Sequence, residues 1–284
     1  IDGQVGSLLY IELSKHHVVR GVNRESSDFI KPCSVLKEIK NFKPTCVINA
    51  AAFTNVDLAE TEIELSWQIN ANTVKTMASY CSDNNITLVH FSTDYVFDGA
   101  KDMPYVEDDC PNPINIYGKS KLAGELFIQE SGCRHIIIRL SWVVSSTHNC
   151  FLTTMHKLIR TNKEVKVVNN QLSAPTSNKF IVSVLIKVIN RLKSFDNGIY
   201  HLSCAGHASC LDYTEFIIKH LKRGEIYSNL AKLQPITLQE YGAKAQRPQQ
   251  SLLNCDKLFG LIEHERYEWK IDSAEQIKYL VKNA

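Results

Sequence analysis

Short apolar runs alternate with helical stretches along the first half of the chain, and this alternation restricts the fold more than any other feature. The runs that read as strands cover residues 18–22, 46–49, 86–91 and 135–139. The stretches with helical spacing of apolar residues cover residues 7–13, a segment opened by Pro32, residues 62–84 and about 115–129. Strands that alternate with helices of this length form β-α-β units around a parallel sheet.

Composition excludes several classes of protein. The 284 residues are 44% apolar and 22% charged, as in ordinary soluble globular proteins. A net charge of +2 gives no argument for a nucleic-acid or membrane partner, and no apolar run approaches the roughly 20 residues of a spanning helix. We expect no signal peptide, because the first residues lack a basic segment followed by an apolar one. Nine scattered cysteines without a C-x-x-C pair predict reduced thiols in the cytoplasm, rather than disulfides or structural zinc.

The start of the first helix is a candidate dinucleotide site. Gly3-Gln4-Val5-Gly6 leads into it, and glycines let a phosphate approach the backbone N–H groups at the positive helix end. A plain glycine-rich helix entry is the alternative. Arg24 follows the next strand, where a basic residue suits a 2′-phosphate and an acid would suit a ribose diol. Unless Arg24 is a simple surface residue, the sequence favours NADP(H), with NAD(H) possible.

The expected architecture is a Rossmann-type doubly wound parallel sheet with a smaller α+β C-terminal lobe. The dinucleotide fingerprint needs a strand and a glycine before Gly3, and the sequence begins too late to contain them. We therefore expect the first strand of the sheet to be missing. The dinucleotide-binding domain is expected at residues 1–145 with a returning segment at about 163–203. The substrate-binding lobe is expected at residues 146–162 and 204–284.

Tyr117 and Lys121 lie four residues apart, on one face of the helical stretch that starts near Asn115. A free tyrosine has a pKa of about 10, so a role near neutral pH needs a drop of roughly 3 units, or about 4 kcal/mol. One cation about 4 Å away at an effective dielectric near 20 supplies about 4 kcal/mol. Where water is excluded, the charge of Lys121 alone is therefore large enough to lower the pKa of Tyr117 by this amount. The spacing by itself also fits a solvated Tyr-Lys pair.

Thr93 adds a hydroxyl at the carboxyl end of a predicted parallel strand, where open α/β sheets bind ligands. This hydroxyl can hydrogen-bond a substrate oxygen beside Tyr117. A glycine-rich turn at the first helix, a strand-end threonine and a following Tyr-x-x-x-Lys helix form the arrangement of the extended short-chain dehydrogenase/reductase superfamily. The sequence resembles that superfamily over nearly its whole length.

Several segments in both lobes narrow the resemblance to the dTDP-4-dehydrorhamnose reductases. These segments are Asn49–Glu60, Ser92–Gly99, Pro111–Glu125, Arg139–Val143, Ala174–Thr176, Gly198–Leu202 and Arg247–Ser251. The resemblance implies an oxidoreductase of nucleotide-sugar biosynthesis. Its reaction would be the NADPH-dependent reduction of the 4-keto group of dTDP-4-dehydro-L-rhamnose to dTDP-L-rhamnose.

The resemblance also implies a role for individual residues. It assigns Thr93, Tyr117 and Lys121 as the catalytic set, in which Tyr117 protonates the C4 oxygen and Lys121 lowers its pKa and holds the nicotinamide ribose. The residues expected at the cofactor are Gly3, Gln4, Val5, Gly6, Arg24, Ala50, Ala51, Ala52 and Asn70, with Tyr117 and Lys121. The residues expected around the substrate are Thr54, Val56, Tyr95, Trp142 and Arg247, with core packing as the alternative for Trp142. Arg247 would supply a guanidinium fork to the diphosphate.

The sequence departs from the family pattern at a few positions. Val144-Ser145 replaces the usual Tyr-Gly after Trp142, and the usual acid after Thr176 is absent from Ser177–Phe180. Some bacterial members carry a glutamate just after the third glycine, linked to a metal-bridged dimer, and Leu8 stands there in this chain. We therefore expect no metal site. The expected partners are the nucleotide-sugar substrate and, unless the protein is a monomer, a second copy in a homodimer.

Other functions fit parts of the same pattern. The regulatory subunit of methionine adenosyltransferase resembles these reductases and acts as a non-catalytic binding module, but it lacks the sugar-pocket features Thr54-x-Val56-Asp57 and Ser141-Trp142. Related dehydratases usually carry an Asp-Glu pair after the strand-end threonine, where Asp94-Tyr95 stands here, so the sequence favours plain reduction. A reductase or epimerase of a UDP-sugar stays open, because no residue that reads the base can be identified.

Overall fold

The computed structural model describes residues 1–223 and 230–282. At its centre a parallel sheet has the strand order β1-β2-β3-β8. These strands are β1 (Cys46–Asn49), β2 (Thr87–Thr93), β3 (His135–Leu140) and β8 (Gly198–Leu202). Val89 of β2 lies opposite Ile48 on one side and Ile136 on the other. The parallel sheet that the β-α-β pattern predicts is therefore confirmed.

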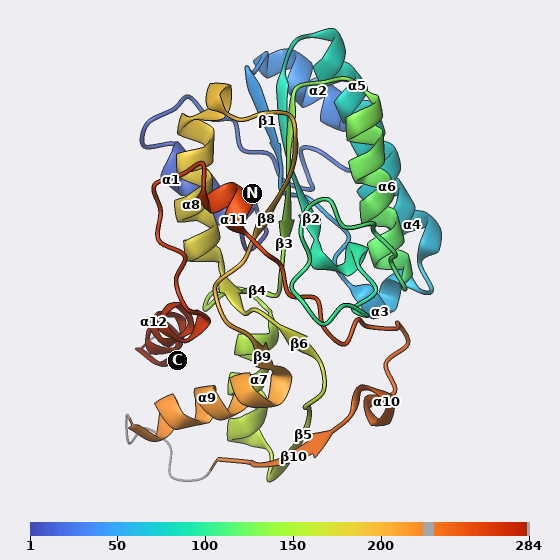
Figure 1. Ribbon diagram of the computed structural model, residues 1–284. Coiled ribbons are helices and arrows are strands. Elements are labelled where there is room, and N and C mark those ends of the chain that lie inside the picture. Colours follow the sequence, from blue (N-terminus) through green and yellow to red (C-terminus); the bar gives the residue numbers. More distant parts are fainter. Residues whose placement is uncertain (224–229, 283–284) are drawn as a thin grey trace.

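Helices cover both faces of this sheet (Figure 1). One face carries α1 (Gly6–Leu13) and α8 (Asn178–Asn190), which contact each other. The other carries α2 (Pro32–Phe42), α5 (Thr73–Asp83) and α6 (Ile116–Glu130). Because both faces are covered, β3 is buried along its whole length and reads as a continuous apolar run rather than an alternating one.

The expected helix at residues 62–84 is a continuous helical stretch made of consecutive parts. These parts are α4 (Ile63–Trp67), a π-helical segment (Gln68–Asn72) and α5. π-helical segments are often found at functional sites. Shorter helices are α3 (Val56–Ala59), α10 (Leu238–Tyr241) and α11 (Asp256–Phe259), and 3₁₀ turns lie at Asp94–Val96 and Leu192–Ser194.

The strand expected at residues 18–22 is wrong. This segment is irregular, the Val18 side chain is 90% exposed, and the Val22 carbonyl accepts a hydrogen bond from the Ile1 ammonium at 2.6 Å. A strand requires a neighbouring strand that pairs with its backbone. In the described ranges no strand pairs with this segment.

A smaller lobe lies beyond the carboxyl ends of the central strands (Figure 1). Its helices are α7 (Phe151–Thr161), α9 (Cys210–Arg223) and α12 (Trp269–Lys282). Its short strand pairs are β5 (Glu164–Val168) with β10 (Lys232–Ile236), β6 (Leu172–Ser173) with β9 (Ala208–Ser209), and β4 (Val143–Val144) with β7 (Thr176–Ser177). β5 pairs with β10 and not with the central sheet, so this strand of the expected returning segment 163–203 lies in the lobe.

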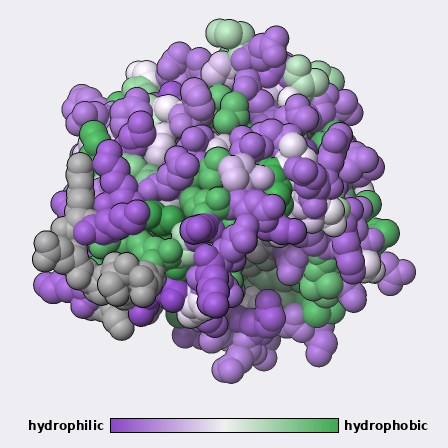
Figure 2. Space-filling model, turned by 90° about the horizontal axis from the view of Figure 1, so that it is seen from below, coloured by the Kyte–Doolittle hydropathy of each residue, from purple (hydrophilic) through white to green (hydrophobic). Residues whose placement is uncertain are grey.

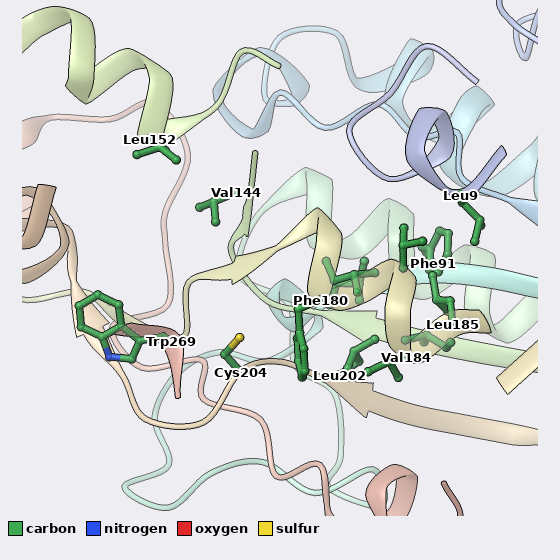
Figure 3. Close-up of a cluster of buried hydrophobic side chains, with 14 of the residues drawn as sticks. Leu9, Phe91, Val144, Leu152, Phe180, Val184, Leu185, Leu202, Cys204 and Trp269 are labelled. Carbon is green, nitrogen blue, oxygen red and sulfur yellow. The ribbon is translucent and has the colours of Figure 1, made fainter. Parts of the chain in front are cut away.

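One hydrophobic cluster joins the sheet to the lobe (Figure 3). On the sheet side it contains Leu9 of α1, Phe91 of β2 and Leu185 of α8. It continues through Leu152 of α7 to Trp269 of α12. Because these side chains pack in one cluster, the lobe is held firmly against the sheet end where β2 and β3 terminate.

Hydrophilic side chains cover most of the molecular face seen from the lobe side (Figure 2). Among the described helices, none has the length and apolar character to cross a bilayer.

Candidate active site

The predicted catalytic residues meet where β2 ends and α6 begins. Thr93 is the buried last residue of β2, and the 3₁₀ turn Asp94–Val96 follows directly. Asn115 caps α6, because its Oδ1 accepts a hydrogen bond from Gly118 N at 2.7 Å. Gly118 lets the helix approach that turn closely, since a Cβ there would overlap the Tyr95 carbonyl oxygen. As a result the Tyr117 ring lies edge-on to the Tyr95 ring, with centroids 6.0 Å apart.

Tyr117 retains its proton in this environment. Burial raises its pKa to about 12, while a hydrogen bond with the Thr93 hydroxyl lowers it and the Asp94 charge raises it. The causes of the shifted pKa of Tyr117 are burial, Thr93 and Asp94, and they do not include the Lys121 amine. The expectation that Lys121 alone brings Tyr117 near neutrality is therefore wrong for the ligand-free protein, because burial dominates. A protonated phenol is the form that can act as a general acid.

The Lys121 amine is turned towards the backbone of β2. Nζ donates to the Phe91 carbonyl at 2.5 Å and lies 3.2 Å from Nε2 of His90. The residue is 1% exposed, and burial lowers its pKa to about 8, against a smaller raising effect of the Glu125 charge. Lys121 is thus held against the backbone of β2, the strand that ends in Thr93.

Asp94 connects the sheet to the lobe through hydroxyl groups. Its Oδ1 accepts from Thr93 Oγ1 at 3.1 Å. Its Oδ2 accepts from Ser251 at 2.5 Å, Ser141 at 3.2 Å and Ser173 at 3.4 Å. Sequence reasoning used Asp94 only to separate reaction types and gave Ser251 no role. Asp94 lies in the segment Ser92–Gly99 and Ser251 ends the segment Arg247–Ser251, both of which carry the family resemblance. The structure shows that Ser251 binds the carboxylate that also contacts Thr93.

Asp94 makes the stability of the fold depend on pH. Burial raises its pKa from 3.8 to about 6, although the Ser251, Thr93 and Ser141 hydroxyls lower it. Because the folded state binds this proton more tightly, the Asp94 contribution to the free energy of unfolding is largest below about pH 4 and is lost as the pH rises to about 6. The shift corresponds to about 3 kcal/mol. We expect the difference in unfolding free energy between the wild type and Asp94→Asn to change by about that amount between pH 4 and 7, measured by urea titration.

The matched control is Asp83→Asn, an exposed carboxylate at the end of α5. Its difference from the wild type should stay constant over the same pH range. A pH-independent difference for Asp94→Asn would contradict the assigned ionisation.

The residues expected around the substrate lie on neighbouring loops. Arg247 pairs with Asp57, with its guanidinium nitrogen 2.7 Å from Oδ2, while Ala245 N donates to Oδ1 at 3.1 Å. This pair joins the Arg247 loop to the Thr54–Asp57 segment, where Thr54 is exposed and Val56 half-buried. The Tyr95 hydroxyl accepts from Gln171 Nε2 at 3.0 Å.

Trp142 packs against aromatic side chains of the lobe and remains partly accessible. Its ring packs edge-on against Phe151 and Tyr213, each at a centroid distance of 5.3 Å, yet the side chain stays half-buried. Its φ of +36° lies in the left-handed region, which is unfavourable for a bulky side chain by roughly 1–3 kcal/mol. Strain of this kind is concentrated at functional sites, and the place of Trp142 in the sugar pocket stays a prediction.

The glycine turn and the end of β1 lie against each other, as a dinucleotide phosphate site requires. A Cβ on Gly6 would lie 3.5 Å from the Ala50 Cβ, and a Cβ on Gly3 would meet open space. The Asn178 side chain fixes the turn by donating to the Gln4 carbonyl at 2.8 Å. Val5 and Ala51 are half-buried, and Ala52 follows in the same loop. These residues fit a pyrophosphate at the start of α1.

Asn70 and Arg24 are the other two residues expected at the cofactor. The Asn70 amide accepts from Phe53 N at 2.8 Å and donates to the Phe53 carbonyl at 3.1 Å and to Ser120 Oγ at 3.0 Å. Both the oxygen and the nitrogen of the Asn70 side chain therefore bind the backbone of the loop after β1. Arg24 lies exposed in a turn, and its place at the 2′-phosphate stays a prediction.

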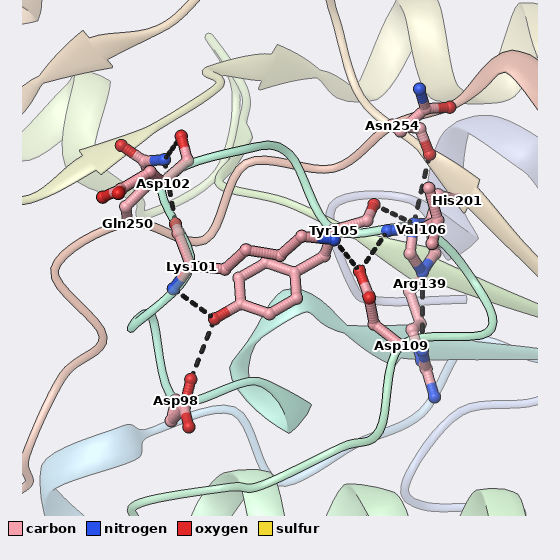
Figure 4. A network of polar contacts seen from close by, with 10 residues as sticks. All are labelled: Asp98, Lys101, Asp102, Tyr105, Val106, Asp109, Arg139, His201, Gln250 and Asn254. Carbon is pink, nitrogen blue, oxygen red and sulfur yellow. Dashed lines mark hydrogen bonds and ion pairs between the residues drawn. The ribbon is translucent and has the colours of Figure 1, made fainter.

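A polar network anchors the loop that leads from Thr93 towards α6 (Figure 4). The Tyr105 hydroxyl donates to Asp98 at 2.8 Å, and Lys101 pairs with Asp109 at 2.6 Å. Nδ1 of His201 on β8 lies 3.1 Å from the Tyr105 carbonyl. The loop is thereby attached to β8, which limits the freedom of the α6 start.

The described residues contain no group of three or more His, Cys, Asp or Glu side chains that could hold a metal ion, and each of their cysteines is a free thiol.

Comparison with known proteins agrees with this geometry. Over residues 1–281 the chain matches the family described as the RmlD substrate binding domain. The dTDP-4-dehydrorhamnose reductase of Escherichia coli strain K12 is 36% identical over 81% of this chain and 78% of its own length. The crystal structure of a dTDP-4-dehydrorhamnose reductase from Clostridium acetobutylicum has a TM-score of 0.90 and 33% identity, covering 99% of this chain and 97% of that one. That of the Bacillus anthracis enzyme in complex with NADP has a TM-score of 0.85 and 30% identity, covering 100% and 96%.

Proposed function

Since this chain belongs to the RmlD substrate binding domain family, we propose that it is a dTDP-4-dehydrorhamnose reductase. It uses NADPH, with NADH as a possible substitute, to reduce the 4-keto group of dTDP-4-dehydro-L-rhamnose to dTDP-L-rhamnose. The observation that carries the proposal is the protonated Tyr117 held beside Thr93 at the carboxyl end of β2. Reduction of a ketone consumes one hydride and one proton, and a buried phenol at this position supplies the proton.

The cofactor supplies the hydride of the reaction, and the protein supplies the proton. Tyr117 donates its proton to the C4 oxygen, and the resulting tyrosinate regains a proton from solvent. The Thr93 hydroxyl contacts Asp94 Oδ1 at 3.1 Å, and its hydrogen bond with the Tyr117 hydroxyl positions the phenol. Burial keeps the phenol protonated by raising the pKa of Tyr117, and the Asp94 charge raises it further.

The remaining site residues are part of the same proposal. Gly3, Gln4, Val5 and Gly6, with Ala50, Ala51 and Ala52, border the dinucleotide phosphates and adenosine. Lys121 holds the nicotinamide ribose, while Thr54, Val56, Tyr95, Trp142 and Arg247 surround the nucleotide sugar. Arg247 would exchange its Asp57 partner for a diphosphate oxygen. We further propose a cytoplasmic location, which the free thiols support, and a monomer or homodimer without a bridging metal.

We also propose the division of labour between the two parts of the chain. Residues 1–145 bind the dinucleotide, and the lobe binds the substrate. The pairing of β5 with β10 supports a return to the sheet near Thr176, just before α8, rather than at residue 163.

The test is a direct assay. Purified protein is mixed with NADPH and dTDP-4-dehydro-L-rhamnose, and the absorbance of the reduced nicotinamide is followed. The proposal expects oxidation of NADPH that depends on the sugar nucleotide, and the same assay with a UDP-linked 4-keto sugar shows which nucleotide the enzyme prefers. Absence of sugar-dependent oxidation would favour a non-catalytic binding module.

Arg24 is expected to determine the preference for NADPH. An ion-assisted hydrogen bond to the 2′-phosphate contributes about 1.5–3 kcal/mol, so Arg24→Ala should lower the NADPH-to-NADH ratio of kcat/KM by roughly 10- to 100-fold. The rate with NADH should not change. Lys31→Ala, at an exposed cation after the same segment, is the control and should leave the ratio unchanged. An unaltered ratio in Arg24→Ala would remove Arg24 from the cofactor site.

A further inference from the structure

A cluster of polar side chains around His148 lies beside the first turn of α1. Nε2 of His148 lies 3.4 Å from Oγ of Ser7, the second residue of that helix. On the other side of the ring, Nδ1 lies 3.0 Å from the Thr147 Oγ1 and 3.4 Å from the Ser145 Oγ. The loop between β4 and α7 therefore brings an imidazole to the helix start at which the dinucleotide pyrophosphate is placed.

The backbone that carries His148 is fixed to the glycine turn and to α7. Asn178, the buried first residue of α8, donates to the Gln4 carbonyl of the glycine turn at 2.8 Å and to the Ser145 Oγ at 3.3 Å. The His148 carbonyl accepts from the Thr153 Oγ1 in the first turn of α7 at 3.0 Å. Because Asn178 contacts both the loop and the turn, the position of the imidazole relative to the glycine turn is set before a ligand binds.

Of the two ring nitrogens of His148, Nε2 is the one suited to a ligand. Its distance of 3.4 Å to the Ser7 Oγ is long, since hydrogen bonds between nitrogen and oxygen mostly span about 2.7–3.2 Å. Nδ1 has a hydroxyl oxygen at 3.0 Å, which restrains the ring. The side chain is half-buried, so part of it stays accessible. A phosphate oxygen beside Nε2 would replace the long contact by a shorter, charge-assisted hydrogen bond.

Positive charge is scarce where the pyrophosphate would lie. A pyrophosphate is negatively charged on both phosphates, and a helix start contributes only about half an elementary charge. The segments that meet there cover residues 1–13, 49–55, 141–150 and 174–178, and their sequences contain neither lysine nor arginine. His148 is the one residue in these four segments whose side chain can become positively charged. Of the two acids in them, Asp2 is exposed, and Glu12 pairs with Lys15 at the far end of α1.

We propose that His148 is a further residue of the dinucleotide site, and that its Nε2–H donates a hydrogen bond to the cofactor pyrophosphate. The loop of His148 continues from the end of β3, where Leu140 lies opposite Thr93, so it approaches from the side of the catalytic residues. The phosphate next to the nicotinamide ribose is therefore the one that it binds. His148 follows Ser145, in the segment where the sequence departs from the family pattern, so the family motifs do not predict this contact. The inference rests on the proposed function, because it requires a dinucleotide at α1.

Three ligands locate the contact, and isothermal titration calorimetry gives the dissociation constant of each. NADP⁺ and 2′-phospho-ADP-ribose both contain the whole pyrophosphate, and of these two only NADP⁺ contains the nicotinamide. Adenosine 2′,5′-bisphosphate lacks the phosphate next to the nicotinamide ribose. The variants are His148→Ala and His148→Phe, of which the second keeps the volume of the ring without its nitrogens. His207→Ala, at an exposed histidine just before β9, is the matched control.

Both His148 variants should bind NADP⁺ and 2′-phospho-ADP-ribose about 10-fold more weakly than the wild type, because one charge-assisted hydrogen bond is lost. Their affinity for adenosine 2′,5′-bisphosphate should equal that of the wild type, which also shows that the site is folded. Equal affinities for all three ligands, a loss confined to NADP⁺, or the same loss for the bisphosphate would overturn the proposal and leave the proposed function standing. A wild type that binds neither NADP⁺ nor 2′-phospho-ADP-ribose would overturn both.

Discussion

Tyr117→Phe is expected to lower kcat by about 10²–10⁴-fold while leaving the fold and the cofactor affinity nearly unchanged. The phenylalanine fills the same space beside Tyr95 but has no proton to give to the C4 oxygen. The hydroxyl also hydrogen-bonds Thr93, which keeps its other contacts with Asp94 and with Tyr95 N. The measurement is the steady-state rate of NADPH oxidation at saturating nucleotide sugar, with NADPH affinity followed by fluorescence.

Tyr279→Phe, on the exposed side of α12, is the matched control and should retain the wild-type rate. A Tyr117→Phe protein with full activity would remove Tyr117 as the proton donor. Loss of NADPH binding in the same variant would instead assign Tyr117 to the cofactor site alone.

Glu125→Gln is expected to lower the free energy of unfolding by about 3–5 kcal/mol, since it leaves the Arg139 guanidinium buried without a charged partner. The pair is bidentate and both side chains are at most 1% exposed. Arg139 also stacks over the Phe97 ring at 5.0 Å, a contact that the variant leaves in place. The measurement is equilibrium unfolding in urea at neutral pH.

The exposed pair between Arg20 and Glu38 provides the comparison. Its nitrogen–oxygen distance is 3.2 Å and the arginine side chain is 55% exposed, so Glu38→Gln should change the unfolding free energy by less than about 1 kcal/mol. Combining Glu125→Leu with Arg139→Met should recover much of the loss, because neither charge is then left unpaired. Equal changes in the unfolding free energy for Glu125→Gln and Glu38→Gln would show that the buried pair stabilises the fold no more than the exposed pair does.

The sequence predicts the central architecture because strand and helix periodicities are local properties. The apolar runs at β1, β2 and β3 are visible without any structure, and so is the Tyr-x-x-x-Lys spacing on α6. The segment at residues 18–22 has the same apolar character but is irregular, because pairing with a neighbour and not composition makes a strand.

The contacts between distant segments could not be predicted in the same way. Ser251 reaches Asp94 across 157 positions, and nothing in the sequence near either residue indicates the contact. Lys121 was expected to face Tyr117 from the helix spacing, yet its long side chain turns to Phe91 and His90 on β2. Spacing on a helix fixes the direction of Cβ but not the position of a flexible side chain end. His90 is a polar residue inside an apolar run, and this is the signal in the sequence that would have indicated the buried contact with Lys121.

The transfer of deuterium from cofactor to sugar tests the central claim most directly. NADPH carrying deuterium at the transferable position of the nicotinamide C4 is incubated with the protein and dTDP-4-dehydro-L-rhamnose, and the product is examined by mass spectrometry and NMR. The account predicts dTDP-L-rhamnose with one deuterium bound to C4 of the sugar, and no deuterium bound to C4 when the label is in the solvent. Recovery of unreduced sugar, or a product with solvent deuterium on C4, would contradict it.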